Sequence, residues 1–227
     1  MRHELLAEDW VITSDNSAGI GEKPLDAVSA SDRNTAKFAA RVALLEQWAA
    51  GSEPEAVLLH NFSGHAQWQR YVEGIEELFK ETDMTSLPIA GSSETNMETL
   101  QSGVAVTMFG KRIRELTATD LTWFVYGAPL VGSDVLKNSE QVADTKKIRQ
   151  ALMSGLIDRI WPVGSKGIKR EMELLSGKPL TVSAAVDVTA SGGPATCVMI
   201  GVGKGKIKQL TPHFGIHIYP LHLTQQK

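Results

Sequence analysis

The chain has 227 residues, with 23 Lys and Arg against 26 Asp and Glu and a formal net charge of −3 at pH 7. This length is enough for one large domain or two small ones, and it can bury a core without disulfides or structural zinc. The composition is that of an ordinary globular protein, and the slightly acidic charge balance argues against a dedicated nucleic-acid binder.

The single cysteine and the apolar runs indicate where in the cell the protein is located. Cys197 cannot form an internal disulfide, and its place in the apolar run TCVMIGV predicts a buried thiol. No apolar run reaches the ~18 residues of a membrane span, and the start MRHELLAEDW has no apolar core of a signal peptide. We expect a cytoplasmic protein whose partners include neither a membrane nor nucleic acid.

Hydrophobic periodicity predicts strands and helices mixed along the whole chain. The expected elements are strand 10–14 with a glycine-rich loop, helix 34–50, strand 57–62, helix 66–80, strands 87–91, 103–110 and 121–127, helix 139–157, a loop and helix over 163–177, and strands in LTVSAAVDV, TCVMIGVG and the tail. This order predicts an α/β or α+β fold. The charged stretch 111–120 is the expected domain boundary, which gives domains 1–113 and 114–227.

Three carboxylates stand out as candidate Mg²⁺ ligands. Asp15 follows the first strand, Glu46 interrupts an apolar helix, and Glu94 lies in a polar turn after the strand 87–91. Hard oxygen ligands of this kind suit Mg²⁺, which usually accompanies substrate phosphates. Each residue alone also fits a helix cap or a solvated charge, and their spacing does not show that they converge.

A glycine-rich loop and a few polar residues are candidate contacts for a phosphorylated ligand. Gly19, Gly21 and Lys23 form a loop that can approach phosphate, although an exposed lysine is more often only solvated. His60 is a candidate for proton transfer, and Asn61 and Asn96 are candidate contacts for a ribose or base. A lone histidine near a strand end is more often structural than functional.

A second glycine- and lysine-rich stretch, GVGKGKIK at 201–208, superficially looks like a phosphate loop. It lacks the Walker spacing and the Ser or Thr that follows it. We therefore interpret it as a basic hairpin turn.

The order of these motifs resembles one known superfamily. The segments are VITSDNSAGIGEKPLDAV, a helix ending AAGSEP, and PIAGSSETNMETLQSGVAVTMFG. They are similar to elements of the aminoimidazole ribonucleotide synthetase (PurM-like) and selenophosphate synthetase superfamily, which also includes thiamine-monophosphate kinase. Ser14-Asp15 matches the family's Thr-Asp element, Gly51 and Pro54 match its Gly-Ala-x-Pro, and Gly91 to Glu94 match its Gly-Gly-Asp/Glu turn.

The resemblance implies a two-domain PurM-like fold in which the N-terminal domains of a homodimer form a shared β-barrel. It also implies an ATP- and Mg-dependent enzyme. Asp15, Glu46 and Glu94 would hold Mg²⁺, and Lys23 with Gly19 and Gly21 would steady the phosphates. Glu46 stands where the family has Asp, so a metal contact from this position has a longer reach.

Within the superfamily, GIGEKPLDAV, FAARVALLEQWAAG and GSSETNMETLQSGVAVT look closest to the alpha-ribazole kinases of cobalamin salvage. This predicts a phosphotransferase acting on a nucleoside-like small molecule. Two alternatives stay open. One is an ATP-dependent synthetase related to aminoimidazole ribonucleotide synthetase. The other is a nucleotide-binding homologue that has lost catalysis, which the shorter chain and the altered acidic positions favour.

Overall fold

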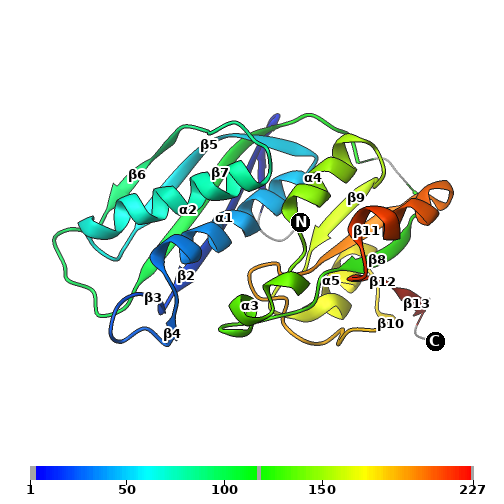
Figure 1. The fold of residues 1–227 in the computed structure, drawn as a ribbon. Helices are drawn as coiled ribbons and strands as arrows, with labels where there is room; N and C mark the ends of the chain where they lie inside the picture. Colours follow the sequence, from blue (N-terminus) through cyan, green and yellow to red (C-terminus); the bar gives the residue numbers. More distant parts are fainter. Residues whose placement is uncertain (1–3, 117–118, 226–227) are drawn as a thin grey trace. The chain divides into compact units, whose positions relative to one another are not determined.

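The structure, a computed structural model, describes residues 4–116 and 119–225 (Figure 1). The chain divides into two compact units, residues 1–115 and residues 116–227, which we call unit 1 and unit 2.

Unit 1 is built on a five-stranded sheet in the order β1-β2-β7-β5-β6. Its pairs are antiparallel except β5 with β6, which run parallel. The strands of this sheet are β1 Glu4–Ala7, β2 Trp10–Ala18, β5 Ser52–Asn61, β6 Ile89–Ser93 and β7 Gly103–Arg112. Two short parallel strands, β3 (Ile20–Gly21) and β4 (Val28–Ser29), pair within the loop that follows β2. Alternating buried residues on β5 and β7 direct one face of the sheet towards the core.

Two helices pack on that face, as Figure 1 shows. They are α1 (Asp32–Ala49) and α2 (Trp68–Glu81), and a short 3₁₀ turn, η1 (His65–Gln67), leads into α2. α1 begins where the Ser31 hydroxyl accepts a hydrogen bond from the Asn34 N–H at 3.2 Å, because a Ser side chain at this position satisfies a free N–H of the first turn. The two helices thereby cover the apolar face of unit 1.

Polar side chains attach α1 to the sheet beneath it. The Thr13 hydroxyl donates to the carbonyl of Ala43 at 2.8 Å. The Gln47 side-chain amide donates to the carbonyls of Val11 and Met108, at 2.9 and 3.0 Å. All three bonds are buried, and a buried hydrogen bond is costly to leave unmade. They fix α1 along β2 and β7.

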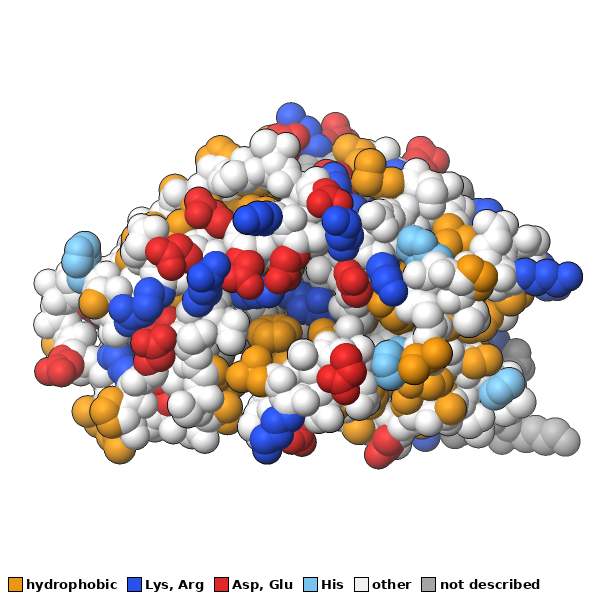
Figure 2. Space-filling model, in the orientation of Figure 1, with side chains coloured by type: hydrophobic (Ala, Val, Ile, Leu, Met, Phe, Trp, Pro, Cys, Tyr) orange, Lys and Arg blue, Asp and Glu red, His pale blue; other side chains and the backbone are white. Residues whose placement is uncertain are grey.

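The outer surface of the helix pair is charged. Arg33 and Lys37 of α1 both pair with Glu77 of α2, and Lys37 also pairs with Glu81. Figure 2 shows acidic and basic side chains interleaved over this part of the surface. The pattern is that of a solvated helix face.

Unit 2 contains a four-stranded antiparallel sheet in the order β12-β8-β11-β9. Its strands are β8 Thr122–Tyr126, β9 Arg159–Pro162, β11 Val198–Val202 and β12 Ile218–Pro220. A separate antiparallel pair is made by β10 (Leu180–Ser183) and β13 (His222–Gln225). The helical segments are α3 Asp134–Lys137, η2 Ser139–Gln141, α4 Thr145–Met153, α5 Gly167–Ser176, η3 Lys204–Gln209 and α6 Leu210–Phe214. Cys197 is buried, as its apolar setting predicts.

Three sequence-based expectations need correction. β2 continues to Ala18, because the polar residues after Ser14 still pair with β7, so Asp15 lies inside the strand. The expected helix 139–157 is divided into η2 and α4, since Asp144 caps a new helix by accepting the N–H groups of Lys146 and Lys147. The expected basic hairpin turn at 201–208 is instead the end of β11 followed by the 3₁₀ helix η3.

Within the described ranges, no helix combines the length and the apolar character needed to cross a membrane.

Candidate functional site

Several chain segments meet at one end of the unit 1 sheet. The last residue of β2, Ala18, pairs with the first residue of β7, Gly103. The last residue of β5, Asn61, pairs with Val104 of β7 and with Ser93, the last residue of β6. We call this region, residues 19–31, 61–64 and 93–103, the loop end. It brings together the glycine-rich loop, the turn after β5 and the polar segment before β7.

The glycine-rich loop is held tightly against the segment before β7. Gly19 has a φ of +69°, and its N–H donates to the carbonyl of Ser102 at 2.8 Å. A Cβ atom on Gly21 would lie 2.3 Å from the Ser102 hydroxyl oxygen and 2.9 Å from a carboxylate oxygen of Asp26. Both glycines are therefore needed by the path of the loop itself, whatever ligand it binds.

Asp26 is the centre of this arrangement. Its carboxylate accepts the N–H of Lys23 at 2.9 Å and both the N–H and the hydroxyl of Ser102 at 2.7 Å. Burial opposes ionisation of this carboxyl, but the hydrogen bonds from Ser102 and Lys23 outweigh it and hold the pKa of Asp26 below its ordinary value of 3.8. The ionised Asp26 thus links the glycine-rich loop to Ser102, the residue before β7.

The Lys23 ammonium group is directed to a protein partner. Its Nζ donates to the carbonyl and to the hydroxyl of Thr99, each at 2.6 Å. The Thr99 hydroxyl in turn donates to the carbonyl of Phe62. An ammonium group has three N–H donors, so one remains for a ligand. The predicted phosphate contact is reduced to this single donor.

The two predicted asparagines have different surroundings. Asn61 is buried; its Nδ2 donates to the Gly64 carbonyl at 2.6 Å and to the Ser93 hydroxyl at 3.0 Å, and its Oδ1 accepts the Ser63 N–H at 2.8 Å. Both amide hydrogens are therefore used in shaping the turn after β5, and a ligand could use only Oδ1. Asn96 is exposed, and its N–H donates to the Glu94 carboxylate at 2.7 Å.

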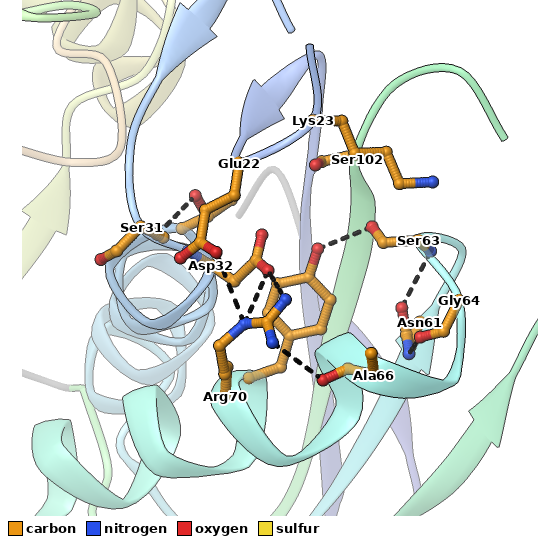
Figure 3. Close-up of polar contacts among 12 residues, drawn as sticks. Glu22, Lys23, Ser31, Asp32, Asn61, Ser63, Gly64, Ala66, Arg70 and Ser102 are labelled. Carbon is orange, nitrogen blue, oxygen red and sulfur yellow. Dashed lines mark hydrogen bonds and ion pairs between the residues drawn. The ribbon is translucent and has the colours of Figure 1, made fainter.

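An ion pair between a buried carboxylate and a partly exposed guanidinium lies beside the loop and is shown in Figure 3. Asp32 at the start of α1 is fully buried, and its Oδ2 accepts from Nε and Nη2 of Arg70 on α2, at 3.0 and 2.7 Å. The other carboxylate oxygen, Oδ1, is buried without a hydrogen-bond partner. Glu22 accepts the Asp32 N–H at 3.1 Å and lies 3.7 Å from Arg70. The hydrogen bond to Asp32 raises the pKa of Arg70, so the guanidinium is permanently charged.

Tyr71 extends this network towards the start of β7. Its hydroxyl is 2.7 Å from the Ser63 hydroxyl, which also accepts the N–H of Gly103. Burial raises the pKa of Tyr71 to about 12, even though the bond with Ser63 acts in the opposite direction. The Tyr71 phenol is therefore neutral at physiological pH. In Figure 3 the Lys23 side chain extends away from Arg70, so these two cations do not converge on one point.

The candidate general base His60 lies on the other side of the sheet. It precedes Asn61 on β5, and successive side chains of a strand point to opposite faces. Since Leu59 and Asn61 are buried on the face that carries the helices, His60 is directed to the opposite face, where it is partly exposed. His60 is thus close to the loop end in sequence but separated from its buried network by the sheet.

The three predicted Mg²⁺ ligands occupy different levels of unit 1. Asp15 pairs with Val106 inside the sheet, and Glu94 lies at the loop end. Glu46 is buried in α1, and the next residue, Gln47, contacts Val11 of β2. Val11 and Asp15 are four residues apart, which is about 13 Å along the strand. In the part of the chain that the structure describes, no three His, Cys, Asp or Glu side chains are grouped so that they could hold a metal ion. The residues of one chain thus do not form a ready three-carboxylate cage, and this ligand set stays a prediction.

Comparisons with known proteins bear on the fold. No protein-family model matches the sequence, and no curated protein matches it. Among solved structures, thiamine monophosphate kinase from Aquifex aeolicus has a TM-score of 0.65 at 10% identity, covering 98% of this chain and 87% of that one. The hydrogenase maturation protein HypE in complex with ATP has a TM-score of 0.65 at 7% identity, covering 97% and 78%. PurL of T. maritima with AMPPCP has a TM-score of 0.62 at 11% identity, covering 98% of this chain and 42% of that one.

These three proteins belong to one structural superfamily. The chain has the PurM-like fold. The expectation of a mixed α/β architecture of this kind is confirmed, and it extends over nearly the whole chain.

Within the PurM-like unit 1, the residues that sequence reasoning missed are Asp26, Asp32, Arg70 and Tyr71. The sequence holds a weak signal for Asp26, which follows Pro24 in a turn-forming stretch. Asp32 directly follows the helix-capping Ser31 and looks like a normal first-turn acid. Their roles appear only when α2 and the start of β7 are placed beside the loop.

Proposed function

We propose that the chain is an ATP-dependent phosphotransferase acting on a nucleoside-like small molecule. The observation that carries this proposal is the PurM-like fold over nearly the whole chain, which it shares with neighbours that include structures solved with ATP and with AMPPCP. One of them, the Aquifex kinase, has also been solved with AMPPCP and TMP together. Phosphoryl transfer requires mainly positioning and neutralisation of charge, which a loop with backbone N–H groups and fixed cations can supply.

The loop end is the part of unit 1 that we assign to the phosphates. Gly19 and Gly21 keep the loop close to the backbone of β7, and Asp26 fixes its shape. The remaining Lys23 donor is available for a phosphate oxygen. The Arg70 guanidinium lies beside the same loop but is paired with Asp32 and does not converge with Lys23, so Lys23 is the cation that we assign to the phosphates. Asn61, Asn96 and His60 stay secondary candidates for contacts with the acceptor.

Mg²⁺ belongs to this proposal through the nucleotide. Mg²⁺ is commonly held by one or two carboxylates together with substrate phosphates. Asp15, Glu46 and Glu94 are therefore each tested as single ligands, although the described residues contain no group of three carboxylates. Substitution of each by its amide, followed by measurement of Mg-ATP affinity, identifies which carboxylate contributes. If all three amide variants bind Mg-ATP like the wild type, this ligand set is wrong.

A homodimer is the assembly that we propose for unit 1. Both helices of unit 1 pack on the same face of its sheet, and Ile12, Leu58 and Phe109, on the opposite face by strand alternation, are only partly buried. Pairing of this face with a second copy would form the barrel that the sequence resemblance implies. Sedimentation of the wild type and of Leu58→Glu, which places a charge on that face, tests the dimer.

One observation favours a second candidate, a nucleotide-binding homologue without catalysis. The acidic residues predicted to hold metal do not gather within the described residues of one chain. Such a protein would bind ATP and turn over no acceptor.

The deciding experiment is mass spectrometry of the purified chain incubated with Mg-ATP and alpha-ribazole, with each omitted in turn. Phosphorylated ribazole that requires both components supports the kinase in cobalamin salvage. Protection by ATP against thermal unfolding without product would overturn that acceptor and leave a nucleotide-binding protein. If the experiment gives no product and ATP gives no protection, the ATP-dependent proposal itself is rejected.

A further inference from the structure

Unit 2 contains a pocket that none of the predicted site residues lines. It has a volume of about 680 Å³ and lies beside the segment 204–214, the orange stretch that follows β11 in Figure 1. Its lining includes Ser154, Leu156, Lys206, Lys208, Pro212 and His213. Small-molecule sites in proteins commonly have volumes of this order. The lysine-rich stretch at 201–208 therefore borders a space large enough for a ligand.

The lining of this pocket is positively charged. It includes two lysines and a histidine, and no Asp or Glu. Asp158, which does not line the pocket, pairs with Lys206: its Oδ1 accepts from the Lys206 ammonium at 2.8 Å, and its Oδ2 accepts the Gly203 N–H at 2.9 Å. This contact holds Lys206 in place and uses only one of its three N–H donors.

The second lysine of the pocket has no counter-ion among the residues that the structure describes. Lys208 forms no ion pair within the described residues, and the same is true of Lys204, which is exposed on η3 but does not line the pocket. The His213 ring is fixed, because its Nε2 lies 2.8 Å from the carbonyl oxygen of Lys147. A carbonyl oxygen only accepts hydrogen bonds, so this contact places a proton on Nε2. Lys206 and His213 are thus both held in place by contacts within the protein.

The remaining lining offers a different surface. Leu156 and Pro212 present apolar side chains, and the hydroxyl of Ser154 adds a polar group. A sugar-like ring can place its C–H groups on the apolar residues while its hydroxyls face polar ones. Inorganic phosphate alone would leave this part of a 680 Å³ space unused.

We propose that this pocket of unit 2 binds a small organic phosphate. Lys206 and Lys208 hold the phosphate group, and the organic part lies against Leu156 and Pro212. Every lining residue belongs to unit 2, whereas the loop end that we assign to the ATP phosphates belongs to unit 1.

The test is an NMR titration of the ¹⁵N-labelled full chain at pH 7 and constant ionic strength, with three probes. Ribose 5-phosphate carries both parts of the expected ligand, ribose lacks the phosphate, and inorganic phosphate lacks the organic part. We expect ribose 5-phosphate to shift the amide signals of residues 154–156, 203–211 and 213–214. A charge-assisted hydrogen bond contributes enough that it should bind at least about tenfold more tightly than ribose.

Two variants separate a defined site from general attraction of anions. Lys208→Gln should weaken ribose 5-phosphate binding about tenfold, because one charge-assisted contact is lost. The matched control Lys204→Gln removes the same charge from the same short helix outside the pocket, and its affinity should equal that of the wild type. Because Lys208 and Lys204 are both exposed and without ion pairs in the described structure, neither change should unfold the protein.

The outcomes are distinct. Equal loss of affinity in the two variants, equal binding of ribose and ribose 5-phosphate, or shifts confined to residues of unit 1 would each overturn the proposal. Inorganic phosphate binding as tightly as ribose 5-phosphate would overturn the recognition of an organic part. None of these results depends on whether the chain phosphorylates alpha-ribazole.

Discussion

Asp32 and Arg70 form a one-sided ion pair: both contacts from the guanidinium go to Oδ2 of the carboxylate, while Oδ1 is buried without a hydrogen-bond partner. Asp32 is buried, whereas the Arg70 side chain is 38% exposed. The pair therefore connects a desolvated charge at the start of α1 to a partner on α2 that water still reaches.

The first prediction concerns this pair. Arg70→Met should lower the free energy of unfolding by about 1–3 kcal/mol, less than for a fully buried pair because Arg70 is partly solvated. Asp32→Asn added to Arg70→Met should recover part of the loss, since it removes the unpaired charge. Urea denaturation measures both. The surface control Arg170→Met, which loses only an exposed pair with Glu173, should cost less than about 0.5 kcal/mol. If Arg70→Met is as mild as this control, the pair between Asp32 and Arg70 does not stabilise unit 1.

The second prediction concerns acid sensitivity. The pKa of Asp26 is lower in the folded chain than its ordinary value of 3.8, so its stabilising contribution is complete above that value and is lost as the pH falls through the lower, folded pKa. Other carboxyls with lowered pKa values, such as Asp158 and Glu77, share this acid range. The comparison must therefore be between wild type and Asp26→Asn. The difference in the free energy of unfolding between them should shrink below about pH 4. A difference that stays constant from pH 6 to pH 3 would contradict a stabilising role of the ionised Asp26.

The third prediction tests the loop end as the phosphate site. Lys23→Met should weaken ATP binding about tenfold, because one charge-assisted donor to phosphate is lost. Lys80→Met is the matched control, since Lys80 is exposed in the last turn of α2. Isothermal titration calorimetry measures both affinities. Thermal melting without ATP shows separately how far the loss of the Thr99 contact loosens the fold. Equal ATP affinities for the two variants would place the phosphates elsewhere.

The fourth prediction concerns Gly21. Gly21→Ala should destabilise unit 1 by about 1–3 kcal/mol, because the new methyl group overlaps the Ser102 side chain and forces the loop outwards. Ala27→Ser, in the same loop, adds one atom without removing a glycine and serves as the control. Differential scanning calorimetry gives the effect. A melting temperature for Gly21→Ala equal to that of the control would show that the loop yields freely.

Local sequence patterns were sufficient for the elements with clear periodicity. α1 and α2 were predicted within a few residues, because their apolar positions recur at helical spacing. β2 was predicted too short, since Ser14 and Asn16 make its second half polar, although the backbone pairing with β7 continues. Pairing partners of a strand are not encoded in its own composition.

The candidate site was only partly predictable for a related reason. Gly19, Gly21 and Lys23 stand out because glycines and a lysine cluster within a few residues. The contacts that organise the loop are long-range: Asp26 and Ser102 are separated by 76 residues, and Asp32 and Arg70 by 38. Each of these side chains alone has an ordinary explanation in its local context, so only the folded arrangement reveals the network.

Buried hydrogen bonds join Thr13 of β2 to α1, and Gln47 of α1 to β2 and β7. These bonds also limit how unit 1 can respond to a ligand. Sliding α1 along the sheet by one turn would break all of these bonds at once, so the position of α1 on the sheet is fixed. We therefore expect α1, β2 and β7 to keep their places when a ligand binds at the loop end. Hydrogen exchange would show this as slow exchange of the amides in the middle of α1, at the same rate with and without ligand.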